Sequence, residues 1–112
     1  MIVFRVQLRV SPAVRDRAVK SLLRLVGPTR TVKGCTACGT YVDVEDGNTL
    51  VYVEEWETQD DLDQRLRTGD VRVLLSVLDL ASEPPCVHFH TINRTRGMEV
   101  IVAARTKAEG GA

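Results

Sequence analysis

The sequence predicts an α+β domain in which helices pack on an antiparallel sheet, and three observations predict it. Segments with the period-two alternation of strands are interleaved with segments whose apolar residues recur at helical spacing. Residues 45–48, with the sequence Glu-Asp-Gly-Asn, form a turn signal between two strand-like segments. The 112 residues are enough for one hydrophobic core and too few for two.

The chain begins with a strand followed by a helix. Apolar residues alternate along residues 2–10, which predicts the first strand. Pro12 suits the first turn of a helix, and an apolar stripe over residues 14–26 continues it. Gly27 and Pro28 are expected to end this helix.

A hairpin and a second helical region follow. Residues 35–44 and 49–56 are rich in β-branched and aromatic residues and predict two paired strands. Thr58, with Asp61 three positions later, approximates a capping box and places a helix start there. Gly69 is expected to interrupt this helix before a second helical segment.

The remaining segments complete the topology. Residues 86–93 predict a fourth strand and residues 98–104 a fifth. The order β-α-β-β-α-β, with one strand added, is the split βαβ arrangement of ferredoxin-like domains. We therefore expect one domain over residues 1–106 and a flexible tail over residues 107–112.

The strand pattern also predicts a homodimer. Two helices cover one face of such a sheet, yet the third strand carries Leu50 and Tyr52 on one side and Val51 and Val53 on the other. A second copy of the same sheet would cover the remaining apolar face through a twofold contact. The alternative is a sheet with one face exposed to water.

Composition restricts the class of protein. Hydrophobic residues make up 44% and charged residues 27%, and 15 basic residues balance 15 acidic ones, so a nucleic-acid or anionic-membrane partner is not expected. Arg5 and Arg9 interrupt the apolar start, and no run is long enough to span a membrane. With an odd number of cysteines, 3, and no export signal, we expect reduced thiols and a cytoplasmic location.

A set of motifs around the hairpin resembles the antibiotic biosynthesis monooxygenase domain family. The matching residues are Gly34-Cys35, Tyr41, Asp43, Asn48-Thr49, Val53-Glu54-Glu55-Trp56-Glu57 and Asp61-Leu62-Asp63-Gln64-Arg65-Leu66, and the likeness continues to Pro85. The resemblance implies a dimeric α+β barrel of ferredoxin-like subunits. It also implies oxidation of quinol-like or anthrone-like aromatics without flavin, haem or metal, so no cofactor is expected.

The chain departs from the family motif at one helical position. The motif usually reads His-Leu where this chain has Arg65-Leu66. A related branch degrades haem with a helical histidine as iron ligand, whereas neither His88 nor His90 lies on a predicted helix. Haem is therefore not expected.

Three residues are candidates for catalysis. Trp56 matches the motif tryptophan of the family, and at a strand end it would either stack on an aromatic substrate or close the core. His88 and His90, two apart on one strand, project to one face with Cys86. Either histidine could accept a proton or serve as a core or interface residue, and no metal site is expected from this pattern.

Other residues are candidates for binding or packing. Cys35 and Cys38, three apart on a strand, are expected to point to opposite faces and to act as small hydrophobic residues. Tyr41 and Tyr52 would line a pocket or seal the dimer face. Candidates for substrate binding are Tyr41, Tyr52, Arg65 and Leu75.

Two functions remain open at the level of sequence. The first is a cofactor-independent monooxygenase that oxidises a small quinol-like or anthrone-like compound, with Trp56 stacking and His88 or His90 as base. The second is a non-catalytic dimeric module of the same fold that binds a ligand or a partner. An open pocket lined by Trp56 and a histidine would favour the enzyme, and a filled core would favour the module.

Overall fold

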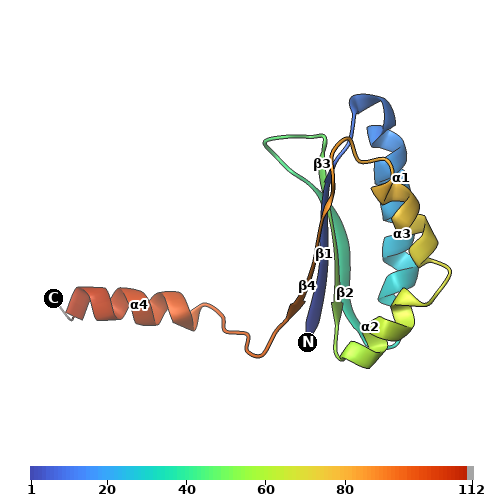
Figure 1. Ribbon diagram of the computed structural model, residues 1–112. Helices are drawn as coiled ribbons and strands as arrows, with labels where there is room; N and C mark the ends of the chain where they lie inside the picture. The colour runs from blue at the N-terminus through green and yellow to red at the C-terminus, as the bar shows by residue number, and fades with distance from the viewer. Residues whose placement is uncertain (111–112) are drawn as a thin grey trace.

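The computed structural model describes residues 1–110, and four antiparallel strands form its single sheet (Figure 1). The strands are β1 (Ile2–Arg9), β2 (Cys35–Val42), β3 (Thr49–Trp56) and β4 (Cys86–Thr91), in the spatial order β2-β3-β1-β4. The helices are α1 (Pro12–Arg30), α2 (Gln59–Leu66), α3 (Val71–Leu78) and α4 (Glu99–Gly110). The expected ferredoxin-like βαββαβ core is confirmed.

The first three helices cover one face of the sheet, as Figure 1 shows. Every second residue of β1 and β3 faces these helices and is buried. The register of the two strands places these helix-facing residues side by side: Phe4 lies opposite Glu54, and Val6 opposite Tyr52. The other positions are mostly half-buried or exposed, and Val51 and Val53 are among the half-buried ones. The opposite face of the sheet, called the open face below, is thus uncovered within one chain.

The predicted start of α2 agrees with the structure, and the predicted end of α1 does not. Thr58 caps α2 as expected, with its Oγ1 accepting a hydrogen bond from the Asp61 N–H at 3.1 Å. The prediction that α1 ends at Gly27 and Pro28 is wrong, since the helix continues to Arg30. Thr29 in this last turn is buried and bonds to a side chain of α2, so tertiary packing outweighs the local breaking signal.

The expected fifth strand over residues 98–104 is wrong, because residues 99–104 lie in α4 and residue 98 belongs to the connection before it. A strand is stable only when it pairs, and no strand lies beside this segment within the described chain, so the backbone satisfies itself by helical hydrogen bonds. Residues 107–110, expected as a flexible tail, form the end of this helix, and residues 111–112 lie outside the described residues.

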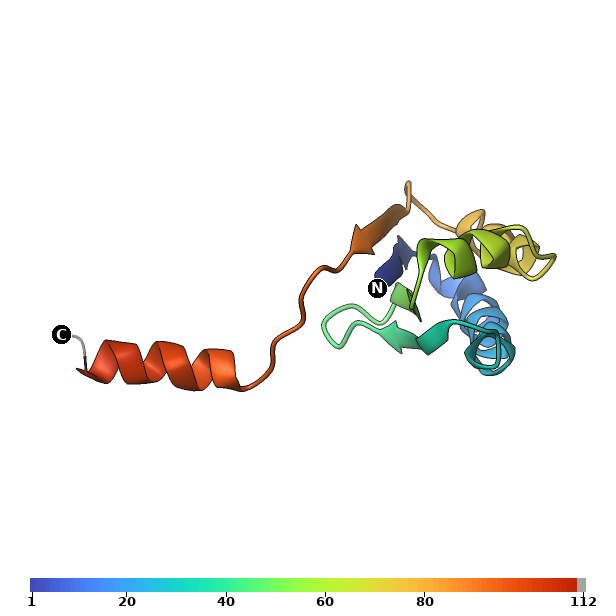
Figure 2. The ribbon, with the colours of Figure 1, turned by 90° about the horizontal axis from the view of Figure 1, so that it is seen from below.

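Helix α4 projects from the side of the sheet opposite to α1, α2 and α3 (Figures 1 and 2). Residues 92–98 connect it to β4, and we call residues 92–110 the arm. The radius of gyration is 17.3 Å, whereas a compact domain of this length would have about 13 Å. None of the described helices is both long and apolar enough to cross a membrane.

Gly34 fixes the approach of β2 to α2, and its replacement should be costly. Its φ is +88°, and a Cβ there would overlap the Asp61 carboxylate. We expect Gly34→Ala to lower the free energy of unfolding by about 1–3 kcal/mol in urea denaturation. Gly47→Ala is the matched control, since nothing lies within 4 Å of its added Cβ. Equal stability of the two variants would contradict this role of Gly34.

Candidate functional site

A buried carboxylate, Glu54, lies between the sheet and the helices and accepts hydrogen bonds from three side chains. Trp56 Nε1 donates to Glu54 Oε1 at 3.0 Å, and Tyr52 Oη donates to Glu54 Oε2 at 2.5 Å. Arg65 Nη2 donates to Glu54 Oε2 at 3.2 Å, which completes an ion pair. The four residues, which we call the Glu54 cluster, are at most 1% exposed.

The strand period and one helix position assemble this cluster. Tyr52, Glu54 and Trp56 occupy alternate positions of β3 and therefore face the helices together. Arg65 enters from α2, and its Nη2 also donates to Thr29 Oγ1 of α1 at 3.1 Å. The cluster thus ties one strand to two helices.

The protonation states in the cluster follow from burial and neighbouring charge. Burial raises the pKa of Tyr52 far above its ordinary value, and the Glu54 carboxylate raises it further, so Tyr52 stays a neutral donor. Burial lowers the pKa of Arg65, but Glu54 more than offsets this, so its pKa is raised overall. Arg65 therefore stays charged. Its Nε is buried without a hydrogen-bond partner among the described residues.

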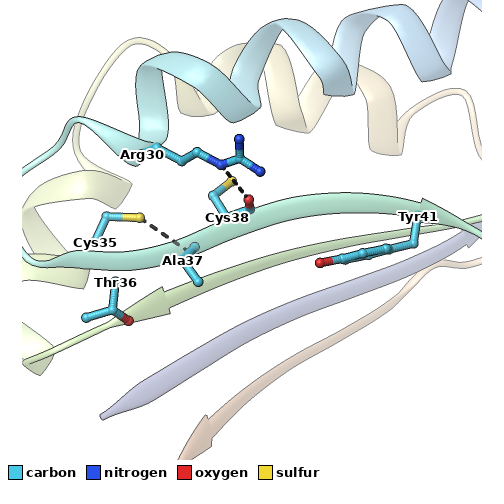
Figure 3. Close-up of a pocket in the computed structure, with 6 residues that line it drawn as sticks. All are labelled: Arg30, Cys35, Thr36, Ala37, Cys38 and Tyr41. Carbon is cyan, nitrogen blue, oxygen red and sulfur yellow. Dashed lines mark hydrogen bonds between the residues drawn. The ribbon is translucent and has the colours of Figure 1, made fainter.

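A surface pocket of about 460 Å³ lies along the outer edge of β2 (Figure 3). Its walls come from the end of α1 and from β2, an edge strand of the sheet. The lining residues are Arg30, Cys35, Thr36, Ala37, Cys38 and Tyr41. Its volume is in the range of small-molecule sites.

The expectation that Cys35 and Cys38 point to opposite faces is wrong. The register of β2 on β3 shifts between Cys35 and Ala37, so Cys35 lies opposite Trp56 and Cys38 opposite Glu54. Because one extra residue is inserted there, both thiols face α1, and Figure 3 shows them on that side of the strand. Both are free thiols, and Cys38 is buried.

Cys38 connects the pocket to the Glu54 cluster. Its Sγ donates to Tyr52 Oη at 3.4 Å, and Tyr52 in turn donates to Glu54. Burial raises the pKa of the Cys38 thiol, so it remains protonated and acts as a donor at neutral pH. In both hydrogen bonds the donor lies nearer the pocket wall and the acceptor nearer the buried carboxylate.

The structure does not bring all the candidates of the sequence together. Trp56, Tyr52 and Arg65 meet in the cluster, whereas Tyr41, 60% exposed, lies on the pocket wall. His88 and His90 are exposed on the open face of the sheet, opposite Arg5 and Val3, with ring centroids 5.5 Å apart.

Leu75 of α3 is 52% exposed and lies in neither the cluster nor the pocket. No group of three or more metal-binding side chains occurs among residues 1–110. Neither histidine and no part of Trp56 is among the residues that line the pocket at the edge of β2.

Sequence reasoning missed the central residue and the pocket's only charged residue. Glu54 is two positions from both Tyr52 and Trp56 on one strand, and this spacing was sufficient to place it on their face. Arg30 was not identified, because the expected helix end at Pro28 put it in a loop. The structure places Arg30 in the last turn of α1, where its Nε donates to the Cys38 carbonyl at 3.0 Å.

Comparison with known proteins identifies relatives by family and by fold. The family model described as antibiotic biosynthesis monooxygenase matches residues 1–75. Comparison with curated protein sequences gives no significant match.

Solved structures share the fold at low sequence identity. A structure described as an antibiotic biosynthesis monooxygenase has a TM-score of 0.74 at 23% identity, covering 84% of this chain and 100% of the other. Protein Rv0793 of Mycobacterium tuberculosis has a TM-score of 0.76 at 20% identity, covering 86% and 98%. A conserved protein of Methanosarcina mazei has a TM-score of 0.73 at 20% identity, covering 80% and 89%.

Proposed function

Since this chain belongs to the antibiotic biosynthesis monooxygenase family, we propose that it oxidises a small electron-rich aromatic compound with O₂ and without a resident cofactor. The substrate class is quinol-like or anthrone-like. For an anthrone the reaction is R₂CH₂ + O₂ → R₂C=O + H₂O, in which the substrate supplies all the electrons. The protein then has to bind the substrate, exclude water and accept a proton.

The observation that carries this proposal is the hydrogen-bonded chain from Cys38 through Tyr52 to Glu54. A substrate in the pocket at the edge of β2 lies against Cys38, and the inward order of donors offers a route for its proton to the buried carboxylate. The deprotonated, electron-rich substrate adds O₂, the peroxide takes up the proton, and loss of water forms the carbonyl. Arg65 holds Glu54 in position in this scheme.

Tyr52→Phe tests this route because it removes the one hydroxyl that links Cys38 to Glu54. We measure kcat as O₂ consumption with a panel of anthrones and hydroquinones. We expect kcat to fall about a hundredfold, which is the lower end of the usual effect of a positioned proton acceptor. Cys86→Ala, a change at an exposed thiol, is the control.

Two outcomes of this experiment would count against the proposal. A rate equal with and without the wild-type protein contradicts the enzyme function itself. Full activity in Tyr52→Phe, with loss in His88→Gln or His90→Gln, assigns the proton transfer to a histidine of the open face instead.

We further propose that the protein acts as a homodimer in the cytoplasm, where its three thiols stay reduced. The open face carries half-buried apolar residues, among them Val3, Val51 and Val53, and the arm leaves the sheet on this same side (Figures 1 and 2). An isolated helix of 12 residues is marginal in water. A second copy would cover both surfaces in one twofold contact.

Removal of the arm tests the dimer. In sedimentation at micromolar concentration we expect the full chain to be dimeric and a chain ending at Asn93 to dissociate at least tenfold more readily, since it lacks Val100, Ile101 and Val102. A full chain that sediments only as a 12.4 kDa species contradicts the proposal.

One observation favours a second function, a ligand-binding module without catalysis. Trp56 is fully enclosed and its ring N–H is already bonded to Glu54, so it offers no face to a substrate. Ligand binding in the pocket without any O₂ consumption would establish this alternative.

A further inference from the structure

We propose that Cys35 and Cys38 together bind one copper(I) ion, with the Arg30 guanidinium balancing the charge of the two thiolates. All three residues line the pocket at the edge of β2, and Figure 3 shows both thiols and Arg30 on the α1 side of this strand. This side stays accessible whether or not a second copy covers the open face. No step of the oxidation proposed above uses the ion, so binding experiments alone decide whether the site exists.

The bulge in β2 brings the two thiols onto one face and shortens the spacing between them. Cys35 lies opposite Trp56 and Cys38 opposite Glu54, so the two cysteines are as far apart as two successive helix-facing positions of β3. Such positions are about 6.4–6.8 Å apart along a strand. A disulfide tolerates a Cα separation of up to about 6.8 Å and prefers a shorter one. The spacing therefore suits a metal ion between the two sulfurs better than a direct bond.

The Cys35 side chain is already directed along the strand towards Cys38. Its Sγ donates to the Ala37 carbonyl at 3.4 Å, and Figure 3 shows the sulfur on the Cys38 side of its own Cα. With metal–sulfur bonds of about 2.3 Å, the length found for zinc, two sulfurs in line with one ion would be about 4.6 Å apart. This is less than the Cα spacing, so the two side chains need only incline towards each other.

Two thiol ligands select a soft cation of low coordination number. Thiolates favour Cu(I), whereas a structural zinc site almost always needs four ligands. No group of three or more histidine, cysteine, aspartate or glutamate side chains occurs in residues 1–110, so the described chain does not complete a zinc site. Copper(I) is stable with two sulfur ligands in a line, which makes it the ion that this pair of residues fits.

The charges around the pocket favour the complex, which carries one net negative charge. Arg30 is the only charged residue that lines the pocket, and its Nε donates to the Cys38 carbonyl at 3.0 Å. This bond holds the guanidinium on the same side of β2 as both sulfurs. Glu54 opposes a thiolate at Cys35, but its carboxylate is paired with Arg65 at 3.2 Å.

The thiols of the empty site are protonated at neutral pH. Burial raises the pKa of Cys35 and that of Cys38. A protonated thiol is a poor nucleophile and resists oxidation, whereas a thiophilic metal displaces its proton. We therefore expect two protons to be released for each copper ion bound.

Competition with the chelator bathocuproine disulfonate, under anaerobic and reducing conditions, tests the site on the full chain. We expect one Cu(I) per chain, and we expect Cys35→Ser and Cys38→Ser each to weaken binding at least a hundredfold, because each leaves a single soft ligand. Cys86→Ser removes an exposed thiol outside the pocket and should bind as the wild type does. Cys35 is only half-buried, so Cys35→Ser tests the site even if Cys38→Ser is unstable.

Each of the following results would overturn the site. Equal affinity in the wild type and Cys35→Ser would show that the two sulfurs do not act together. Loss of binding in Cys86→Ser would move the copper to the exposed thiol. Release of fewer than two protons per Cu(I), measured by titration at constant pH, would contradict a dithiolate complex.

Arg30→Gln tests the part played by the positive charge. We expect the affinity for Cu(I) to fall about tenfold, because the complex loses the nearest cation that lines the pocket. Arg24→Gln, at another exposed position of α1, is the matched control and should leave the affinity unchanged. The same affinity in Arg30→Gln as in the wild type would overturn the role given to Arg30.

Discussion

Replacing Arg65 by methionine should lower the free energy of unfolding by about 3–5 kcal/mol, because it leaves the Glu54 carboxylate buried and without its counter-charge. Both side chains of the pair are 1% exposed, so water cannot take the place of the guanidinium. The loss also frees Thr29, whose hydroxyl accepts from Arg65. Urea denaturation at one fixed protein concentration measures the effect.

A double-mutant cycle separates the pair from the rest of the cluster. Glu54→Gln keeps the shape of the side chain and an oxygen that can accept from Tyr52 or Trp56. The double variant Glu54→Gln/Arg65→Met has no buried charge, so we expect it to lose about 1–3 kcal/mol less than the sum of the two single changes. Additive losses, or a loss below about 1 kcal/mol for Arg65→Met, would contradict a tightly coupled buried pair.

Truncating Trp56 to alanine should be as destabilising, for a different physical reason. The side chain is fully buried at the end of β3, and its removal leaves a cavity that the sheet and helices cannot collapse to fill. We expect a loss of about 3–5 kcal/mol. Glu54 Oε1 also loses its donor.

Trp56→Phe distinguishes the cavity from the hydrogen bond. Phenylalanine fills most of the volume but has no ring N–H, so we expect a loss of about 1–3 kcal/mol in the same urea experiment. Leu75→Ala is the control for a large apolar side chain outside the core, since it is half-exposed and should change stability little. A Trp56→Ala variant as stable as Leu75→Ala would show that Trp56 packing does not stabilise the core.

Most of the fold was predictable because period and capping act locally. The alternation in β1 and β3, the hairpin turn and the Thr58 cap each depend on neighbouring residues, and each is confirmed. The segment over residues 98–104 was not predictable in this way. Its β-branched residues favour a strand only where another strand can pair with it, and the described chain provides none.

The candidate site was predictable only in part. The resemblance pointed to Trp56 and to the position of Arg65, and the period of β3 contained the information for Glu54. The pocket could not be found, because it depends on a bulge beside Thr36 and on a helix that passes Pro28 to reach Arg30. Both are outcomes of packing between segments that are separate in the sequence.

The placement of Glu54 between Tyr52 and Trp56 has a consequence for the fidelity of folding. If β3 paired with β1 one residue out of step, these three polar-tipped side chains would turn to the solvent and Val51, Val53 and Glu55 would enter the interior. The polar partners of the cluster would then contact the aliphatic side chains of Val51 and Val53 and a displaced Glu55 carboxylate. These partners are Thr29, Cys38 and Arg65. The buried polar contacts can therefore form in only one register of the strands, and a purely aliphatic core of the same volume would not select that register in this way.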